Sequence, residues 1–398
     1  MPTSYLPYAP DQQLLLPHSL QEWLPQGHLA HYINDTIDTL DLSAFFKRYQ
    51  GGGSRNQPFH PAMMVKVLVY GYATGVFSSR KIAKKLHEDV AFRVLAADNF
   101  PKPRTLSDFR ALHLQELAAL FVQVVKLARE CGLVKLGTIA VDGTKLRAKA
   151  SKHKAMSYER MQAREIELKA QIDTLLKRAA QTDKAEADEP ELDIPAELAL
   201  RQERLEVIKA AKQRLEARQR EADTRRGRKP EGKDADGDDG DGGASDTSPQ
   251  PKKRGHAFKR AFGVPEPKAQ DNFTDPDSRI MKTSAGFEQC FNAQTAVDAG
   301  AQIIVAAELS NCAADSALLP TMLDAVKSNT GQVPEVLLAD AGYRSEAVLA
   351  QLSGKQVEVI VALGREGKKQ SEIDAHKHPH TAAMAAKLKT QPGQDKYR

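Results

Sequence analysis

Hydrophobic residues recur every three or four positions through most of the first third of the chain. The spacing is clear in the runs 61–75 and 78–96, where apolar and polar side chains alternate at the period of an amphipathic helix. In the second run, Ile82 and Leu86 share one face and cations occupy the opposite face. The pattern predicts an all-helical N-terminal domain over residues 1–130.

The pattern changes at residue 137, where short runs of apolar and β-branched residues replace the helical spacing. Runs of this length are typical of buried strands. Two amphipathic segments, 314–329 and 345–354, lie between the last three runs and predict helices. Successive strands followed by alternating helices and strands predict an α/β fold, a mixed sheet flanked by helices. The predicted strands are residues 137–143, 289–298, 301–309, 334–340 and 357–364.

A long insertion of different composition separates the first predicted strand from the second. Residues 153–223 are rich in Ala, Glu, Lys, Arg, Gln and Leu, and their apolar stripes predict an antiparallel helical hairpin of coiled-coil type. Residues 224–275 contain few apolar side chains and are predicted to be a disordered linker. The insertion therefore divides one α/β domain into residues 131–152 and residues 276–398.

Composition excludes several classes of protein. The chain has 398 residues, and its 41% hydrophobic content is ample for more than one core. No apolar run is long enough to span a bilayer, and the N-terminus lacks the features of a signal peptide. The 3 cysteines are far apart and have no metal-ligand spacing. We therefore expect a cytoplasmic protein with reduced thiols and no membrane partner.

Two aspartates stand where strands end. Asp142 follows the run 137–141, and Asp340 follows the run 334–339. Ligands of open α/β sheets bind beyond the carboxyl ends of the strands, and converging carboxylates at such a place suit a divalent metal ion. The alternative is that each aspartate only caps the turn or helix that follows it.

Cations follow both aspartates closely. Lys145, Arg147 and Lys149 come after Asp142, and Arg344 comes after Asp340. Carboxylates for a metal beside cations for phosphate indicate phosphodiester chemistry.

The helical N-terminal region has cations of its own. Short helices joined by tight turns and edged with cations resemble a helix-turn-helix arrangement. The alternative is an ordinary helical bundle whose cations form its solvated face. The candidate DNA contacts here are Arg80, Lys84, Lys85, Arg104 and Arg110.

With these aspartates on the first and fourth strands of a mixed sheet, the chain resembles the DDE transposases of bacterial insertion sequences. The resemblance covers FHPAMMVKVLVYGYATGVFSSRKIAKKLHED, LGTIAVDGTKLRAKASKHKAMSYERM, and DPDSRIMK through GFEQCFNAQTAVD to LLADAGYRSEA. It implies an RNase H-like catalytic domain in which Asp142 and Asp340 match two acids of the catalytic triad. It further implies that Asp142 bridges two ions, Mg²⁺ or Mn²⁺, beside the scissile phosphate.

The resemblance also implies the partners. These are double-stranded DNA at the terminal repeats and at the target, and further copies of the chain in a homo-oligomer on that DNA. The protein would then be associated with the bacterial nucleoid when bound.

The third acid of the family is a glutamate on a helix after the fifth strand, in a motif that begins with tyrosine and arginine. Tyr397 and Arg398 look like that beginning, and the sequence stops there. We expect a truncated reading frame that lacks the catalytic glutamate, with activity lost or impaired. The alternative function is a non-catalytic fragment that binds DNA or a partner. Other acids are candidates only by elimination: Glu366, Glu372, Asp374 and Asp395.

A second enzyme class shares part of the first motif. Asp142, Gly143 and Thr144 are similar to the aspartate loop of haloacid dehalogenase-like phosphatases. That loop requires an aspartate two residues earlier, where this chain has Ala140. The phosphoaspartate mechanism is therefore disfavoured.

Overall fold

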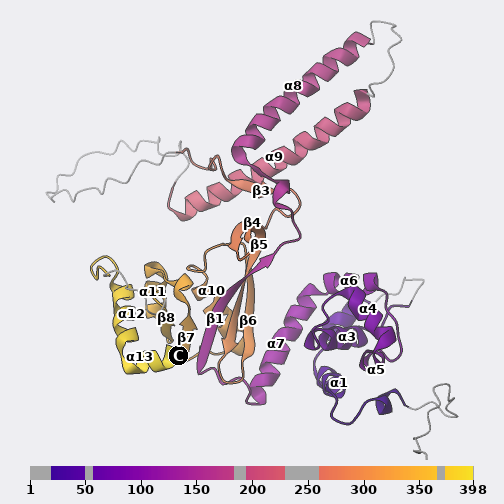
Figure 1. Cartoon of the computed structure of the whole chain (residues 1–398), viewed down its shortest axis with the longest axis vertical. Coiled ribbons are helices and arrows are strands. Elements are labelled where there is room, and N and C mark those ends of the chain that lie inside the picture. The colour runs from indigo at the N-terminus through magenta and orange to yellow at the C-terminus, as the bar shows by residue number, and fades with distance from the viewer. Residues whose placement is uncertain (1–18, 50–56, 183–193, 229–259, 365–372, 398) are drawn as a thin grey trace, which may run out of the picture. The chain divides into compact units, whose positions relative to one another are not determined.

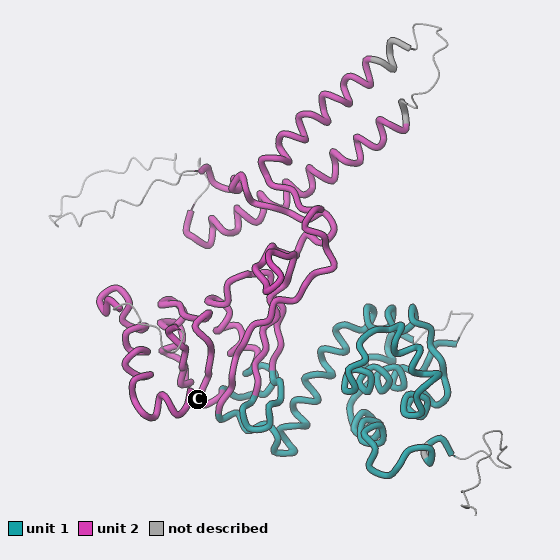
Figure 2. Tube along the Cα trace, viewed as in Figure 1, with its two compact units in different colours: residues 1–137, 298–305, 326–333 teal, residues 138–297, 306–325, 334–398 magenta. Residues whose placement is uncertain are grey.

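The computed structural model describes residues 19–49, 57–182, 194–228, 260–364 and 373–397. The chain divides into two units, which are coloured separately in Figure 2. Unit 1 comprises residues 1–137, 298–305 and 326–333, and unit 2 comprises residues 138–297, 306–325 and 334–398.

The described residues of unit 1 form helices between Leu20 and Lys47 and between Pro61 and Glu130, as the hydrophobic spacing predicts. The helix α3 is apolar nearly all round and lies in the core of the unit, with Met64, Val65 and Leu68 buried. Its elements (Figure 1) are η1 Leu20–Trp23, α1 Leu29–Thr39, α2 Ser43–Lys47, α3 Pro61–Ala73, α4 Ser79–Glu88, α5 Val90–Leu95, α6 Pro103–Leu112 and α7 Leu114–Glu130.

The helix α4 shows why these segments pack as they do. Ile82 and Leu86 are fully buried, and Arg80 and Lys84 on the other face are exposed. The apolar face packs within the core cluster of unit 1, and α4 contacts α6.

Among the described residues no single helix has the length and apolar character to cross a membrane. The bent pair α6 and α7 would be long and apolar enough if the two helices were counted together, by length and composition alone.

Unit 2 is built on a mixed sheet in which the strands are ordered β4-β5-β1-β7-β8, with β6 also paired to β5. This is the RNase H-like α/β architecture that the sequence predicts. The strands of this sheet (Figure 1) are β1 Thr138–Arg147, β4 Arg279–Thr283, β5 Gly286–Asp298, β6 Ile303–Ser310, β7 Val336–Ala339 and β8 Glu358–Val361. The short β4 is the strand that the hydrophobic pattern does not predict.

The centre of this sheet is parallel and apolar. β1 pairs with β7, and β7 pairs with β8, both in parallel. Ile139 and Val141 of β1 are buried, as are Leu337 and Ala339 of β7, and such β-branched and apolar runs favour central strands. The helices of this part are α10 Leu319–Thr330, η3 Ala341–Tyr343, α11 Glu346–Ser353, α12 Pro379–Lys389 and α13 Gln391–Tyr397.

The insertion after β1 contains two long helices, α8 Tyr158–Thr182 and α9 Ile194–Arg225, which lie side by side and antiparallel in Figure 1. Leu168, Leu205 and Leu215 form their shared core. At the base, β2 Ala155–Ser157 pairs with β3 Gln270–Asn272. The turn of the hairpin, residues 183–193, lies outside the described residues.

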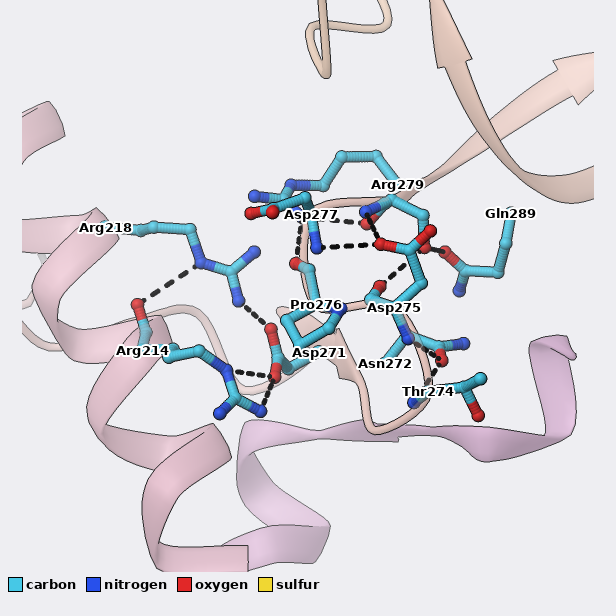
Figure 3. A network of polar contacts seen from close by, with 11 residues as sticks. Arg214, Arg218, Asp271, Asn272, Thr274, Asp275, Pro276, Asp277, Arg279 and Gln289 are labelled. Carbon is cyan, nitrogen blue, oxygen red and sulfur yellow. Dashed lines mark hydrogen bonds and ion pairs between the residues drawn. The ribbon is translucent and has the colours of Figure 1, made fainter. Parts of the chain in front are cut away.

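A buried carboxylate joins the hairpin to this small ribbon (Figure 3). The side chain of Asp271 is fully buried and pairs with two arginines of α9, Arg214 at 2.6 Å and Arg218. Beyond it, Ser278 donates to the side chain of Gln289 on β5. The network therefore runs from α9 to a strand of the main sheet.

The prediction of a disordered linker over residues 224–275 is wrong at both of its described ends, because α9 continues to Arg225. Residues 260–275 contain β3, and Asp271 is buried there. Pairing with β2 and with arginines of α9 orders a stretch whose own composition is too polar to fold alone. Residues 229–259 lie outside the described part of the chain.

Candidate active site on two neighbouring parallel strands

The pairing of β1 with β7 brings the two predicted aspartates together. The register aligns Val141 with Ala339, so the next residues, Asp142 and Asp340, stand at the same level of neighbouring strands. Adjacent strands lie about 4.8 Å apart, and paired positions project from the same face of a sheet. Both aspartates are exposed. The prediction that their strands are neighbours is confirmed.

Each aspartate also accepts a hydrogen bond from a backbone amide just after it. The amide of Gly143 donates to Oδ1 of Asp142 at 2.7 Å, and the amide of Gly342 donates to Oδ1 of Asp340 at 2.9 Å. The strand predicted for residues 137–143 continues to Arg147, so Asp142 lies within β1 and caps no turn, whereas Asp340 is the N-cap of η3, as the alternative interpretation requires. These hydrogen bonds occupy one oxygen of each carboxylate and leave Oδ2 without a partner among the described residues.

These carboxylate oxygens fit a hard divalent cation such as Mg²⁺ or Mn²⁺. Within the described residues, however, no group of three or more His, Cys, Asp or Glu side chains is arranged to hold a metal ion. The structure thus brings two carboxylates to the same level of two adjacent parallel strands.

A third carboxylate, Asp315, lies beside this pair. Its Oδ1 accepts hydrogen bonds from Asn292 at 2.6 Å, from Gln294 at 2.9 Å and from the ammonium group of Lys145 at 3.1 Å. Sequence reasoning missed Asp315. It stands at the start of the predicted helix 314–329, where an aspartate has the ordinary explanation of a helix cap.

The surroundings of Asp315 favour its charged form. Burial alone would raise the pKa of this carboxyl, but hydrogen bonds from Asn292 and Lys145, with the positive charge of Lys145, outweigh burial and hold the pKa below its ordinary value. The neighbouring Tyr343 is buried, and its hydroxyl donates to Gln294. Burial, followed by the charges of Asp315, Asp142 and Asp340, raises the pKa of Tyr343, so all three carboxylates lie within electrostatic reach of one phenol.

Gly143 is required by the closeness of these side chains. A Cβ atom at this position would stand 2.4 Å from Nε2 of Gln294 and 2.9 Å from Oδ1 of Asp315. Both neighbours are held by hydrogen bonds, so neither can withdraw without breaking the network. The absence of a side chain at Gly143 therefore lets Gln294 and Asp315 approach β1 closely.

The C-terminal residues bear on the missing third acid. Burial, followed by the charge of Asp340, raises the pKa of Tyr397 at the end of α13. Glu366 and Glu372 lie outside the described residues. Asp374 accepts the backbone amide of His376, and Asp395 accepts a hydrogen bond from Gln391.

Most of the predicted DNA-contacting cations have protein partners. In unit 2, Lys145 pairs with Asp315, Arg147 pairs with Glu288 at 3.1 Å, and Arg344 donates to the carbonyl of Leu363. In unit 1, an acid four residues later pairs with each of Lys84, Lys85 and Arg104. Arg110 donates to the carbonyl of Phe77.

The remaining predicted cations, Arg80 and Lys149, are exposed and have no partner among the described residues. Lys149 begins a segment that also contains Lys152 and Lys154, which are equally exposed and unpaired within the described chain. We call residues 149–154 the lysine segment. Its backbone is fixed, because the carbonyl of Ser151 accepts from Asn272 and that of Lys154 accepts from the amide of Phe273.

Comparison with known protein families gives two matches. A family model described as a transposase domain matches residues 18–112, and a model described as a transposase DDE domain matches residues 261–396. The first covers the helices of unit 1 as far as α6, and the second covers the part of unit 2 that contains Asp315 and Asp340. No curated protein and no solved structure matches the chain.

Proposed function

Since the chain belongs to the DDE transposases of insertion-sequence type, we propose that it binds the ends of its element and cleaves and transfers DNA strands with Mg²⁺ or Mn²⁺. The observation that supports this proposal most is the placement of Asp142 and Asp340 at one level of two paired parallel strands. We further propose that it acts as a homo-oligomer on nucleoid DNA in the bacterial cytoplasm.

The two aspartates have the roles of ligands in this proposal. A divalent ion bound there would lower the pKa of an attacking water and stabilise the leaving oxygen of a phosphodiester. By its resemblance to the first acid of the triad, Asp142 would hold the ion and would bridge to a second ion where one binds, and Asp340 would hold the ion from the neighbouring strand. The amides of Gly143 and Gly342 fix one oxygen of each aspartate and so orient the other.

The lysine segment is the part of unit 2 best suited to DNA phosphates. Its ammonium groups are exposed and unpaired within the described chain, whereas Lys145 and Arg147 are neutralised by acids. Phosphate contacts from Lys149, Lys152 and Lys154 need no protein ion pair to be broken. In unit 1, Arg80 has the same advantage. Lys84, Lys85 and Arg104 remain candidates, because exposed pairs four residues apart are worth only about 0.3–0.5 kcal/mol.

Replacing Lys149, Lys152 and Lys154 together with alanine should weaken duplex DNA binding and flatten its salt dependence. Each lost phosphate contact lowers the slope of log affinity against log salt by about 0.9, so we expect a decrease of about 2–3. The matched control replaces Lys355, Lys387 and Lys396, which pair with Asp324 or Glu358. An equal decrease in both variants would mean that net charge, and not this segment, governs DNA binding.

We also propose that strand cleavage by this chain is weak. The third acid of the family's triad has no match among the described residues, so a second ion should bind poorly beside the first. Titration with Mn²⁺ should then show one ion that depends on Asp142, with little cleavage of a duplex carrying the element's terminal repeats. Two such ions with robust cleavage would instead indicate an acid outside the described residues, such as Glu366.

The alternative function is a transposase chain that binds DNA or a partner without cutting. The capping role of Asp340 is compatible with it. The same Mn²⁺ titration distinguishes the two functions, because a chain that only binds DNA would bind no ion whose affinity depends on Asp142.

A further inference from the structure

We propose that Asp315 is a positioning residue that holds β1 at Gly143 and the turn after β7 at the spacing at which Asp142 and Asp340 share one ion. The inference rests on the proposed function and adds a residue that acts through the two ligands. Three observations support it: the saturation of one oxygen of Asp315, the location of the carboxylate between Gly143 and Gly342, and a link from Asp315 to Tyr343.

The first observation separates positioning from ligation. A carboxylate oxygen offers about two lone-pair directions, and Oδ1 of Asp315 already receives three donors. Those donors come from β5, through Asn292 and Gln294, and from β1, through Lys145. This oxygen therefore ties two neighbouring strands together and has no capacity left for a metal ion.

The second observation is where the carboxylate lies. Its Oδ1 would be 2.9 Å from a Cβ atom on Gly143, and its Oδ2 would be 3.4 Å from a Cβ atom on Gly342. These are the glycines whose amides donate to Asp142 and Asp340. Because side chains alternate along a strand, positions 143 and 145 of β1 face away from Asp142. Asp315 thus supports β1 from the face opposite the ligand.

The third observation extends the support to the turn after β7. Tyr343 ends the short helix η3 that Asp340 caps, and its hydroxyl donates to Gln294, which in turn donates to Asp315. The aromatic ring is buried, so this hydrogen bond forms away from water. One carboxylate therefore connects β1 with the turn that follows Asp340.

The test measures Mn²⁺ affinity of the full chain by calorimetry and thermal stability of the same samples, with Mn²⁺ alone as the probe. The variants are Asp315→Ala, Asp315→Asn and Asp142→Asn. Asp324→Asn is the control, since it removes an exposed carboxylate of α10 that pairs with Lys355. Asparagine at 315 can still present an oxygen to the donors on Asn292, Gln294 and Lys145, whereas alanine cannot.

We expect Asp315→Ala to weaken Mn²⁺ binding about 10- to 100-fold, as the loss of residues that orient metal ligands does. Asp315→Asn should recover most of that loss, and Asp324→Asn should bind as the unsubstituted chain does. Wild-type affinity in a folded Asp315→Ala protein would overturn the proposal.

The asparagine variant keeps the proposal testable if the alanine variant does not fold. A loss in Asp315→Asn as large as that in Asp142→Asn would show that Asp315 is itself a ligand, and would also overturn it. If Asp142→Asn binds Mn²⁺ normally, the proposed function fails, whatever the variants at 315 do.

Discussion

Replacing Asp142 with asparagine should raise the dissociation constant for Mn²⁺ by more than about 100-fold. Residues that only orient metal ligands are worth about 10- to 100-fold in affinity, and a ligand itself is worth more. Asparagine keeps the shape and the bond from the Gly143 amide, but it removes the negative charge that compensates the cation. Calorimetric titration of the two proteins at the same pH and salt concentration measures the difference.

Asp298 offers a matched control for that experiment. It is an aspartate at the end of a strand, β5, and its carboxylate accepts the backbone amides of Leu136 and Gly300. We expect Asp298→Asn to leave Mn²⁺ affinity unchanged, because the residue lies in unit 1 and both oxygens of its carboxylate are occupied by backbone amides. Equal losses in both variants would mean that a general change of charge, and not ligation, caused the effect.

Replacing Asp271 with alanine should loosen the base of the helical hairpin by about 2 kcal/mol. Removing one partner of a fully buried ion pair costs about 3–5 kcal/mol, because the remaining charge is left uncompensated. Here the side chains of Arg214 and Arg218 are 39% and 30% exposed, so water compensates them in part and the cost is smaller. The elements that lose stability are the ribbon of β2 and β3 and the helix α9, which Asp271 joins (Figure 3).

Hydrogen exchange measures this local loss better than global unfolding, because a chain with more than one unit need not unfold in a single step. A change of about 2 kcal/mol corresponds to exchange about 30-fold faster at the amides of β3 and the second half of α9. Asp173 on α8 is exposed and supplies the control variant Asp173→Ala. Unchanged exchange in Asp271→Ala would mean that the arginines do not anchor the hairpin.

The sequence predicts the frame of this fold well because local patterns determine most of it. Ile139 and Val141 alternate with exposed residues as a strand should, and Ile82 and Leu86 have the spacing of a helix with one buried face. The order of apolar runs and helices then restricts the sheet to few topologies. For these reasons the pairing of β1 with β7, and with it the meeting of Asp142 and Asp340, follows from the sequence.

What the sequence does not predict depends on partners far away in the chain. β3 consists of polar residues, and it is ordered by β2 and by arginines of α9 more than fifty positions earlier. Asp315 has no distinctive neighbours in sequence, and only the folded sheet brings Asn292, Gln294 and Lys145 to its carboxylate. The number of lysines is likewise visible in sequence, but which of them are neutralised is not.

The central claim is that Asp142 and Asp340 hold one divalent ion between neighbouring strands. Diffraction from crystals grown with Mn²⁺, collected near the manganese absorption edge, tests it directly. We predict one anomalous peak at about 2.0–2.2 Å from an oxygen of each aspartate, which is within ordinary metal–oxygen bonding distance. Manganese peaks that contact neither carboxylate, in crystals where both side chains are ordered, would contradict the claim.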